Sequence, residues 1–279
     1  MTDGTSTKDI PWAFLGLLVA LSLPFWVIGA TSRGFLPKSL PFDLPISALM
    51  AVNPCVAASI LTFRERGWEG VRGLLRRALD FGRVAKKIWY LPMLLVWPVT
   101  MVLAYAVMRL MGTPLPDPKI PVPMVPILAI GFALGAAGEE LGWQGYAFAP
   151  LQNRWNALGA AVVVGAVWGL WHLVPFAQSH RPTAWIVWQT LGMIPFRILI
   201  VWLFNNTGKC VFAAIVFHAM SNVSQFLFPN FGSHYDPLIP GLILTLMAAG
   251  VAVLWGPETL ARYGFHEARL RLDGDEGNK

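Results

Sequence analysis

Apolar runs long enough to cross a membrane recur along almost the whole chain. Crossing the roughly 30 Å hydrocarbon layer takes about 20 mostly apolar residues, because each residue of an α-helix rises about 1.5 Å. Runs of this kind lie near residues 11–30, 45–63, 89–111, 122–150, 155–175, 184–204, 210–228 and 238–255. They predict an all-α fold, a polytopic membrane helical bundle with about eight transmembrane helices.

The composition agrees with a bilayer environment. Of the 279 residues 56% are hydrophobic and 13% are charged, against about 25% charged residues in ordinary soluble domains. The net charge of +6 comes mainly from residues between the apolar runs and in the tail, which indicates topology and contact with membrane lipids rather than nucleic acid. Cys55 and Cys210 lie in separate apolar runs and form no CxxC motif, so no disulfide framework or thiolate metal site is indicated.

Lys and Arg gather in two places, which predicts the topology. Segment 64–87 holds eight of them and the C-terminal tail four more, and such residues concentrate on the cytoplasmic side of membrane proteins. We therefore expect a single integral-membrane domain over residues 1–279, with a basic cytoplasmic loop at 64–88 and a cytoplasmic tail at 257–279. The expected location is the cell membrane of a prokaryote, with multiple spans and both termini in the cytoplasm.

Apolar residues recur at helical spacing inside the basic loop. This pattern predicts an amphipathic helix on the inner leaflet, with a solvated linker as the alternative. The apolar positions are Trp68, Val71, Leu74, Leu75 and Leu79.

Two adjacent carboxylic acids, Glu139 and Glu140, stand inside one of the apolar runs. An ionisable side chain at bilayer depth costs about 2.5–3.5 kcal/mol, so two in succession predict polar partners, a water-filled cavity and chemistry. Later runs offer candidate partners, although a single polar residue in a membrane helix more often forms a hydrogen bond between helices than takes part in catalysis. These partners are His172, Arg197, His218 and Asn222.

Helical spacing puts these polar residues on shared faces. His218 and Asn222 are four residues apart and so lie on one face of a helix. The same spacing relates Glu140 to Gln144 and Trp168 to His172. A carboxylate with an imidazole can activate water, while a second imidazole and a carboxamide can donate hydrogen bonds to an oxyanion. The set therefore indicates a hydrolase site that needs no protein nucleophile.

At these residues the chain resembles the CPBP intramembrane proteases, a family that includes type II CAAX prenyl endopeptidases and proteins linked to bacteriocin processing and self-immunity. The family pattern is Glu-Glu-x-x-x-Arg, then Phe-x-x-x-His, then His-x-x-x-Asn or a small residue. Here the runs are Glu139-Glu140-Leu141-Gly142-Trp143-Gln144, Trp168-Gly169-Leu170-Trp171-His172 and His218-Ala219-Met220-Ser221-Asn222. The resemblance covers roughly residues 122–225, the motif-bearing core.

The resemblance implies an endopeptidase that hydrolyses a peptide bond of a membrane-associated or lipid-modified protein. Glu139 and His172 would activate the attacking water, and His218 and Asn222 would stabilise the oxyanion. The remaining residues of the set would support them: Glu140, Gln144, Trp168 and Arg197. Members are described both as metalloproteases and as metal-independent glutamate proteases. We expect no tightly bound metal, whereas a divalent ion such as zinc would take Glu139, His172 and His218 as ligands.

Two positions depart from the family pattern. Trp168 replaces Phe, which we interpret as a conservative aromatic wall. Gln144 replaces Arg, which removes a cation that could neutralise the glutamate pair. Because an unpaired Arg in a membrane span is costly, we expect Arg197 to contact Glu140 and supply that charge. The alternatives are that Arg197 extends along its own span or pairs only with backbone carbonyls.

Two other function classes stay open. An ion- or proton-coupled transport protein could use Glu139, His172 and His218 as a relay, although no repeated halves are visible in the sequence. A non-catalytic immunity or interaction protein could keep the fold after losing activity. The proteolytic interpretation predicts that the Glu139 carboxyl and the two imidazoles converge to within about 3–6 Å.

Overall fold

The computed structural model describes residues 10–31 and 45–261 of the chain, and these parts contain helices and no strand. The part of the predicted tail from residue 262 onward lies outside the described residues, as do residues 1–9. The long helices are α1 (Trp12–Thr31), α2 (Asn53–Arg76), α3 (Tyr90–Leu110), α4 (Val125–Gly142), α5 (Phe148–Gln178), α6 (Thr183–Asn206), α7 (Val211–Leu227) and α8 (Leu238–Trp255).

In the described part of the chain, six helical stretches are long and apolar enough to cross a membrane. Helix α7 is apolar but only 17 residues long. One stretch, Val122–Gln178, runs through α4, a π-helical segment η6 (Trp143–Ala147) and α5. The predicted polytopic bundle is therefore confirmed, and the expected count of eight spans is approximate because two of the predicted runs join into one bent stretch and α7 is short.

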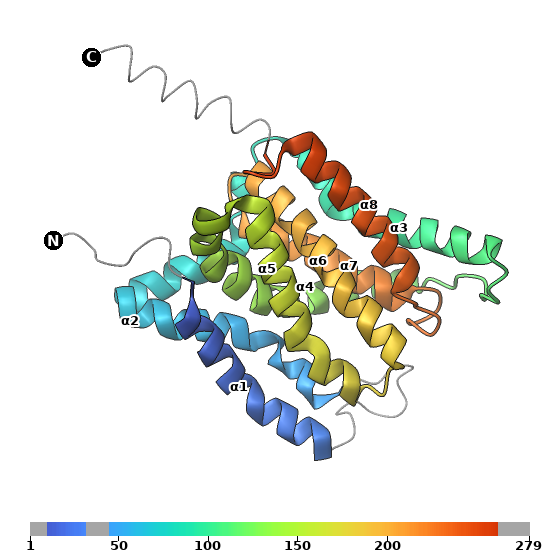
Figure 1. Ribbon diagram of the computed structural model, residues 1–279, viewed down its shortest axis with the longest axis horizontal. Coiled ribbons are helices and arrows are strands. Elements are labelled where there is room, and N and C mark those ends of the chain that lie inside the picture. The colour runs from blue at the N-terminus through green and yellow to red at the C-terminus, as the bar shows by residue number, and fades with distance from the viewer. Residues whose placement is uncertain (1–9, 32–44, 262–279) are drawn as a thin grey trace, which may run out of the picture.

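Helix α6 forms the middle of the bundle. Its residues from Pro195 to Phe204, apolar except for Arg197, are buried without a break because protein surrounds this part of the helix. Helices α5 and α8 pack on either side of it (Figure 1). Helix α7 packs between α4 and α3, and α2 lies against α4. This arrangement places α4, α5, α6 and α7 within reach of one another.

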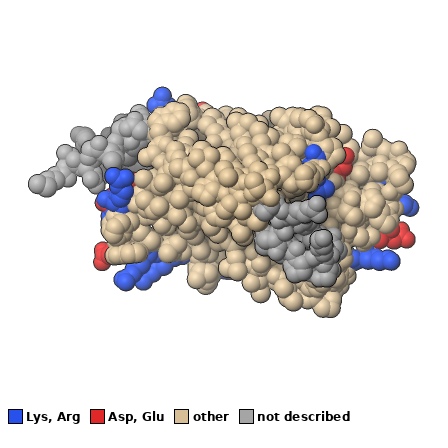
Figure 2. All heavy atoms as spheres, turned by 90° about the horizontal axis from the view of Figure 1, so that it is seen from below, with Lys and Arg blue, Asp and Glu red and all other residues tan. Residues whose placement is uncertain are grey.

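The surface is divided by charge. Figure 2 shows Lys, Arg, Asp and Glu mostly toward the two ends of the molecule in that view, with uncharged surface between them. Large apolar side chains stand exposed on the outer helices, among them Leu110, Leu246 and Val253. Exposed apolar area of this extent is normal only where lipid covers it.

The basic loop predicted at 64–88 is mostly helical. Helix α2 continues through it to Arg76 with a break at Gly67, where φ is 62°, and three short 3₁₀ turns follow: η2 (Arg77–Leu79), η3 (Phe81–Arg83) and η4 (Lys87–Trp89). The predicted apolar positions divide between two environments. Val71 and Leu74 are buried against the protein, whereas Trp68, Leu75 and Leu79 are exposed.

Small residues let α4 approach the start of α2 closely. A Cβ atom built on Gly142 would clash with the carbonyl oxygen of Pro54, and one on Gly138 would lie 2.7 Å from that of Ala51, just before α2 begins. Glycine at this spacing is a common way for membrane helices to bring their backbones together. The contact lies directly beside the two glutamates.

Gly142→Ala should destabilise the protein by about 1–3 kcal/mol, because the new methyl group meets fixed backbone and forces α2 and α4 apart. Gly135→Ala in the same helix is the matched control, since a Cβ there meets no atom within 4 Å. Thermal unfolding in detergent measures both. Equal effects of the two substitutions would contradict a tight α2–α4 contact.

Candidate active site

Four neighbouring helices bring the predicted polar residues together. Both glutamates come from the end of α4, and the later motifs come from α5, α6 and α7. Glu139, Glu140, Gln144, Trp168, Arg197 and His218 are buried, and His172 and Asn222 are half-buried. Each of them thus faces protein rather than lipid over most of its surface.

Glu140 is held by two partners from different helices. Its Oε2 accepts a hydrogen bond from Arg197 Nη1 at 2.6 Å, and its Oε1 lies 2.9 Å from His218 Nδ1. The guanidinium of Arg197 is 0% exposed and also stacks 4.3 Å from the ring centroid of Trp168. The expected contact between Arg197 and Glu140 is present, and the alternative of pairing only with backbone carbonyls is wrong.

Glu139 meets a different set of groups. Its Oε2 accepts a hydrogen bond from the indole N–H of Trp168 at 2.5 Å and lies 3.8 Å from His172 Nε2. His172 Nδ1 lies 2.9 Å from the carbonyl oxygen of Trp168. A carbonyl oxygen can only accept, so Nδ1 carries a proton, and when the ring is neutral its Nε2 lone pair faces Glu139.

The two glutamates therefore have separate partners, as their 100° offset around the helix requires. Glu140 sits between a guanidinium and one imidazole. Glu139 faces the other imidazole across a gap too long for a direct hydrogen bond.

Trp168 joins the two halves of the site. Its ring centroid lies 5.3 Å from that of His172 and 5.2 Å from that of His218, and both pairs meet edge to face. On the outer side His172 stacks on Phe176 at 5.5 Å. We expected only an aromatic wall at position 168, but the indole adds a hydrogen-bond donor that the phenyl ring of the family pattern lacks. The sequence shows that residue 168 is a tryptophan with an N–H donor, but it does not show that this donor bonds to Glu139.

Immediately after the glutamates the helix widens into the π segment η6. Segments of this kind often occur at functional sites. Gln144, in the position of the family arginine, is buried here, and neither of its side-chain polar atoms has a hydrogen-bond partner among the described residues. Gln144 thus lies beside the pair without taking over the lost charge contact.

Asn222 lies one turn after His218 on α7. It is half-buried, and its Oδ1 accepts a hydrogen bond from Ser221 Oγ at 3.5 Å. That contact leaves the amide nitrogen of Asn222 available as a donor.

The predicted metal ligands are not gathered into one cluster among the described residues. Within the described ranges no group of three or more His, Cys, Asp or Glu residues is arranged to hold a metal ion. Nδ1 of His218 faces Glu140, and Nδ1 of His172 faces a backbone carbonyl. Such contacts at Nδ1 leave Nε2 of both rings able to bind a metal, so the ligand set of Glu139, His172 and His218 stays a prediction, and we derive no step through a metal.

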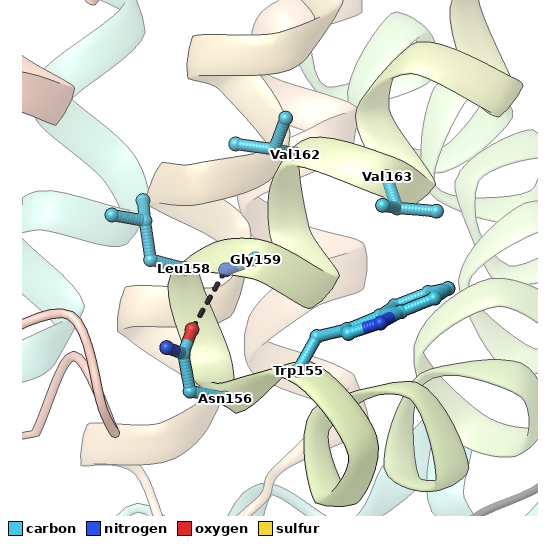
Figure 3. Close-up of a pocket in the computed structure, with 6 residues that line it drawn as sticks. All are labelled: Trp155, Asn156, Leu158, Gly159, Val162 and Val163. Atoms are coloured by element: carbon cyan, nitrogen blue, oxygen red, sulfur yellow. Dashed lines mark hydrogen bonds between the residues drawn. The ribbon is translucent and has the colours of Figure 1, made fainter.

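A surface pocket lies elsewhere on α5 and is lined by none of the predicted site residues. It has a volume of about 580 Å³, and its walls are Trp155, Asn156, Leu158, Gly159, Val162 and Val163 (Figure 3). Asn156, with φ of 67°, kinks the helix, and its Oδ1 accepts a hydrogen bond from Gly159 N at 2.8 Å. The asparagine thus caps the second part of α5, which carries Trp168 and His172.

Comparison with known proteins places the same residues in a shared core. Residues 121–224 match the family model of type II CAAX prenyl endopeptidase Rce1-like proteins. CAAX prenyl protease 2 of Methanococcus maripaludis is 35% identical over 109 residues, which are 36% of this chain and 40% of that protein. Lysostaphin resistance protein A of Staphylococcus haemolyticus is 30% identical over 106 residues, 37% of this chain and 28% of that protein.

The similarity is thus confined to the part of the chain that carries the motifs. It spans less than half the length of either curated relative. All eight predicted site residues, from Glu139 to Asn222, fall inside the matched segment. The comparisons therefore support the resemblance to CPBP intramembrane proteases over this core of the chain.

Proposed function

We propose that the protein is an intramembrane endopeptidase that hydrolyses a peptide bond in a membrane-associated or lipid-modified substrate. The observation that carries the proposal is the facing pair of Glu139 Oε2 and His172 Nε2, 3.8 Å apart in a mostly buried setting. Both atoms are acceptors when His172 is neutral. A water molecule that touches both would donate to one or the other, which is the arrangement needed to activate it.

In this proposal the water attacks the carbonyl carbon of the substrate. Glu139 and His172 together take up the proton that the water loses, and its oxygen forms the new bond to carbon. The protonated base then returns that proton to the leaving amine as the tetrahedral intermediate breaks down. His218 and Asn222 donate hydrogen bonds to the oxyanion while it exists.

The role of His218 sets a condition on its protonation. An ionised Glu140 can only accept, so a neutral His218 keeps its proton on Nδ1 and presents Nε2 as an acceptor. Donation to an oxyanion from Nε2 therefore requires the doubly protonated ring. Arg197 and this imidazolium would then share the charge of Glu140, which supports a role for Glu140 in holding the donor rather than in attacking the substrate.

The surroundings of the site support a substrate held in the same bilayer. The bundle exposes large apolar side chains to lipid, and His172 remains partly accessible while Glu139 and Glu140 are buried. One relative is named a CAAX prenyl protease, so lipid-modified proteins are one substrate class to test.

Replacing the proposed base should abolish processing of the substrate. We expect Glu139→Gln to remove activity because the amide cannot take a proton from water, although it has nearly the same shape. The measurement compares peptide termini in membrane fractions of cells that carry the wild-type protein, the variant or no protein.

Glu69→Gln is the control, since Glu69 is an exposed carboxylate far along α2. Termini that appear with wild type and Glu69→Gln but not with Glu139→Gln would support the proposal. If no terminus distinguished wild type from the empty cells, the proteolytic function would be wrong and the non-catalytic alternative would be favoured. If Glu139→Gln kept full processing, the assignment of Glu139 as the base would be wrong.

The charge balance around Glu140 can be tested by stability. Arg197→Ala should lower the free energy of unfolding by about 3–5 kcal/mol, because it leaves a buried carboxylate without its cation. Adding Gln144→Arg, which restores the family residue one turn after Glu140, should recover part of that loss. A double-mutant cycle on thermal or denaturant unfolding measures the coupling. Independent, additive effects of the two substitutions would rule out the compensation.

A further inference from the structure

The connection between α2 and α3 touches the site helices at two points. We call residues 77–83 the α2–α3 connection; it comprises η2, Asp80 and η3. It precedes residue 121, so it lies outside the segment that matches the family model. Its polar side chains nevertheless reach the π segment after Glu140 and the start of the helix that carries His218.

Asp80 caps α7 from outside the helix. Its Oδ1 accepts hydrogen bonds from Phe212 N at 2.9 Å and from the Cys210 thiol at 3.1 Å, and its Oδ2 accepts one from Val211 N at 3.3 Å. The residue at the N-cap position itself, Cys210, makes no capping bond with its side chain. A carboxylate at a helix N-terminus satisfies free N–H groups and the helix dipole. The start of α7 is therefore fixed by a residue from another segment.

Arg77 bridges the π segment and the turn before α7. Its Nη1 donates to the carbonyl oxygen of Gly145 at 2.5 Å, and its Nη2 donates to that of Lys209 at 3.2 Å. The guanidinium also lies 6.0 Å from the ring centroid of Phe204 at the end of α6. A planar fork of donors can hold two carbonyls in fixed relation, which a lysine cannot do.

These two anchors stand close to the Glu140–His218 contact along both helices. Gly145 follows Glu140 by five residues, and His218 follows Val211 by seven, or about two helical turns. The bond between Glu140 Oε1 and His218 Nδ1 spans the same two elements, α4 with its π segment on one side and α7 on the other. A shift of either anchored end would be transmitted to that bond, because helices move as rigid units.

We infer that Arg77 and Asp80 are positioning residues that hold the π segment and α7 in the register at which Glu140 meets His218. They touch neither the proposed water nor the substrate and act through His218. The inference rests on the proposed function for its effect on catalysis. The geometric effect on His218 does not depend on any activity.

The experiment uses the full-length protein in lipid nanodiscs, with ¹⁵N-labelled histidine. Ring nitrogen shifts report which nitrogen is protonated and what it contacts, and the His218 signals are assigned by their loss in His218→Gln. We expect Arg77→Gln and Asp80→Ala to shift the Nδ1 signal of His218. Asp80→Asn should rescue it, because an asparagine oxygen caps a helix about as well as an aspartate.

Arg76→Gln is the matched control, since Arg76 is the neighbouring arginine and is exposed. It should leave the His218 signals unchanged. Folded Arg77→Gln and Asp80→Ala proteins with wild-type His218 signals would overturn the inference. If either variant does not fold, Arg77→Lys and Asp80→Asn replace them. A shift of the His218 Nδ1 signal in Arg77→Lys but not in Asp80→Asn supports the inference. Wild-type His218 signals in both variants contradict it.

A kinetic measurement separates positioning from stability. With a substrate peptide from the termini comparison, Arg77→Gln should lower kcat by about 100-fold, the loss expected when a distant substitution misplaces a catalytic group by about 1 Å. KM should stay near the wild-type value because the substrate is not contacted. A change confined to KM would contradict the inference. Absence of cleavage by the wild-type protein would count against the proposed function and leave the histidine measurement valid.

Discussion

The buried contact of Glu140 with Arg197 and His218 is the interaction on which the arrangement of the bundle depends. A carboxylate with no exposure and a guanidinium with no exposure must stay together, since separating them would leave charge unpaired in an apolar interior. The three residues come from α4, α6 and α7, so the contact requires those helices to meet at one depth. Trp168 on α5 stacks on the same guanidinium and brings the fourth helix to the site.

With Glu140 compensated in this way, Glu139 is left with different chemistry. It accepts from the indole of Trp168 and faces Nε2 of His172, and no Lys or Arg among the described residues contacts it directly. Two neighbouring carboxyl groups thus take two roles because the helix turns them toward different partners. In the proposed mechanism one glutamate organises the site and the other handles the proton of the water.

Much of this could be predicted from the sequence, because the bilayer makes charged residues costly. Polar side chains inside long apolar runs had to turn inward and find partners, which was enough to group the motifs of α4, α5 and α7 and to connect Arg197 with Glu140. The long apolar runs also located the long helices. The basic loop was predicted as an amphipathic helix, and the sequence signal did not reveal that Val71 and Leu74 pack into the protein.

The remaining features depend on contacts between elements and leave little local trace. Nothing in the residues 143–147 predicts a π segment, and nothing around Asn156 predicts the kink in α5. The indole donor of Trp168 finds Glu139 only once α4 and α5 are packed. The sequence does not show that Gly142 is needed for close packing, because the residue that it contacts, Pro54, belongs to another helix. In each case the partner lies on a different helix, beyond the reach of a spacing rule.

The central claim is that Glu139 and His172 together hold the hydrolytic water, and an experimental density map of the wild-type protein that resolves ordered water tests it most directly. The account predicts a water within hydrogen-bond distance of both Glu139 Oε2 and His172 Nε2, and its loss or displacement in His172→Ala. A direct bond between the two side chains with no water against them, or a water bound to neither, would contradict it.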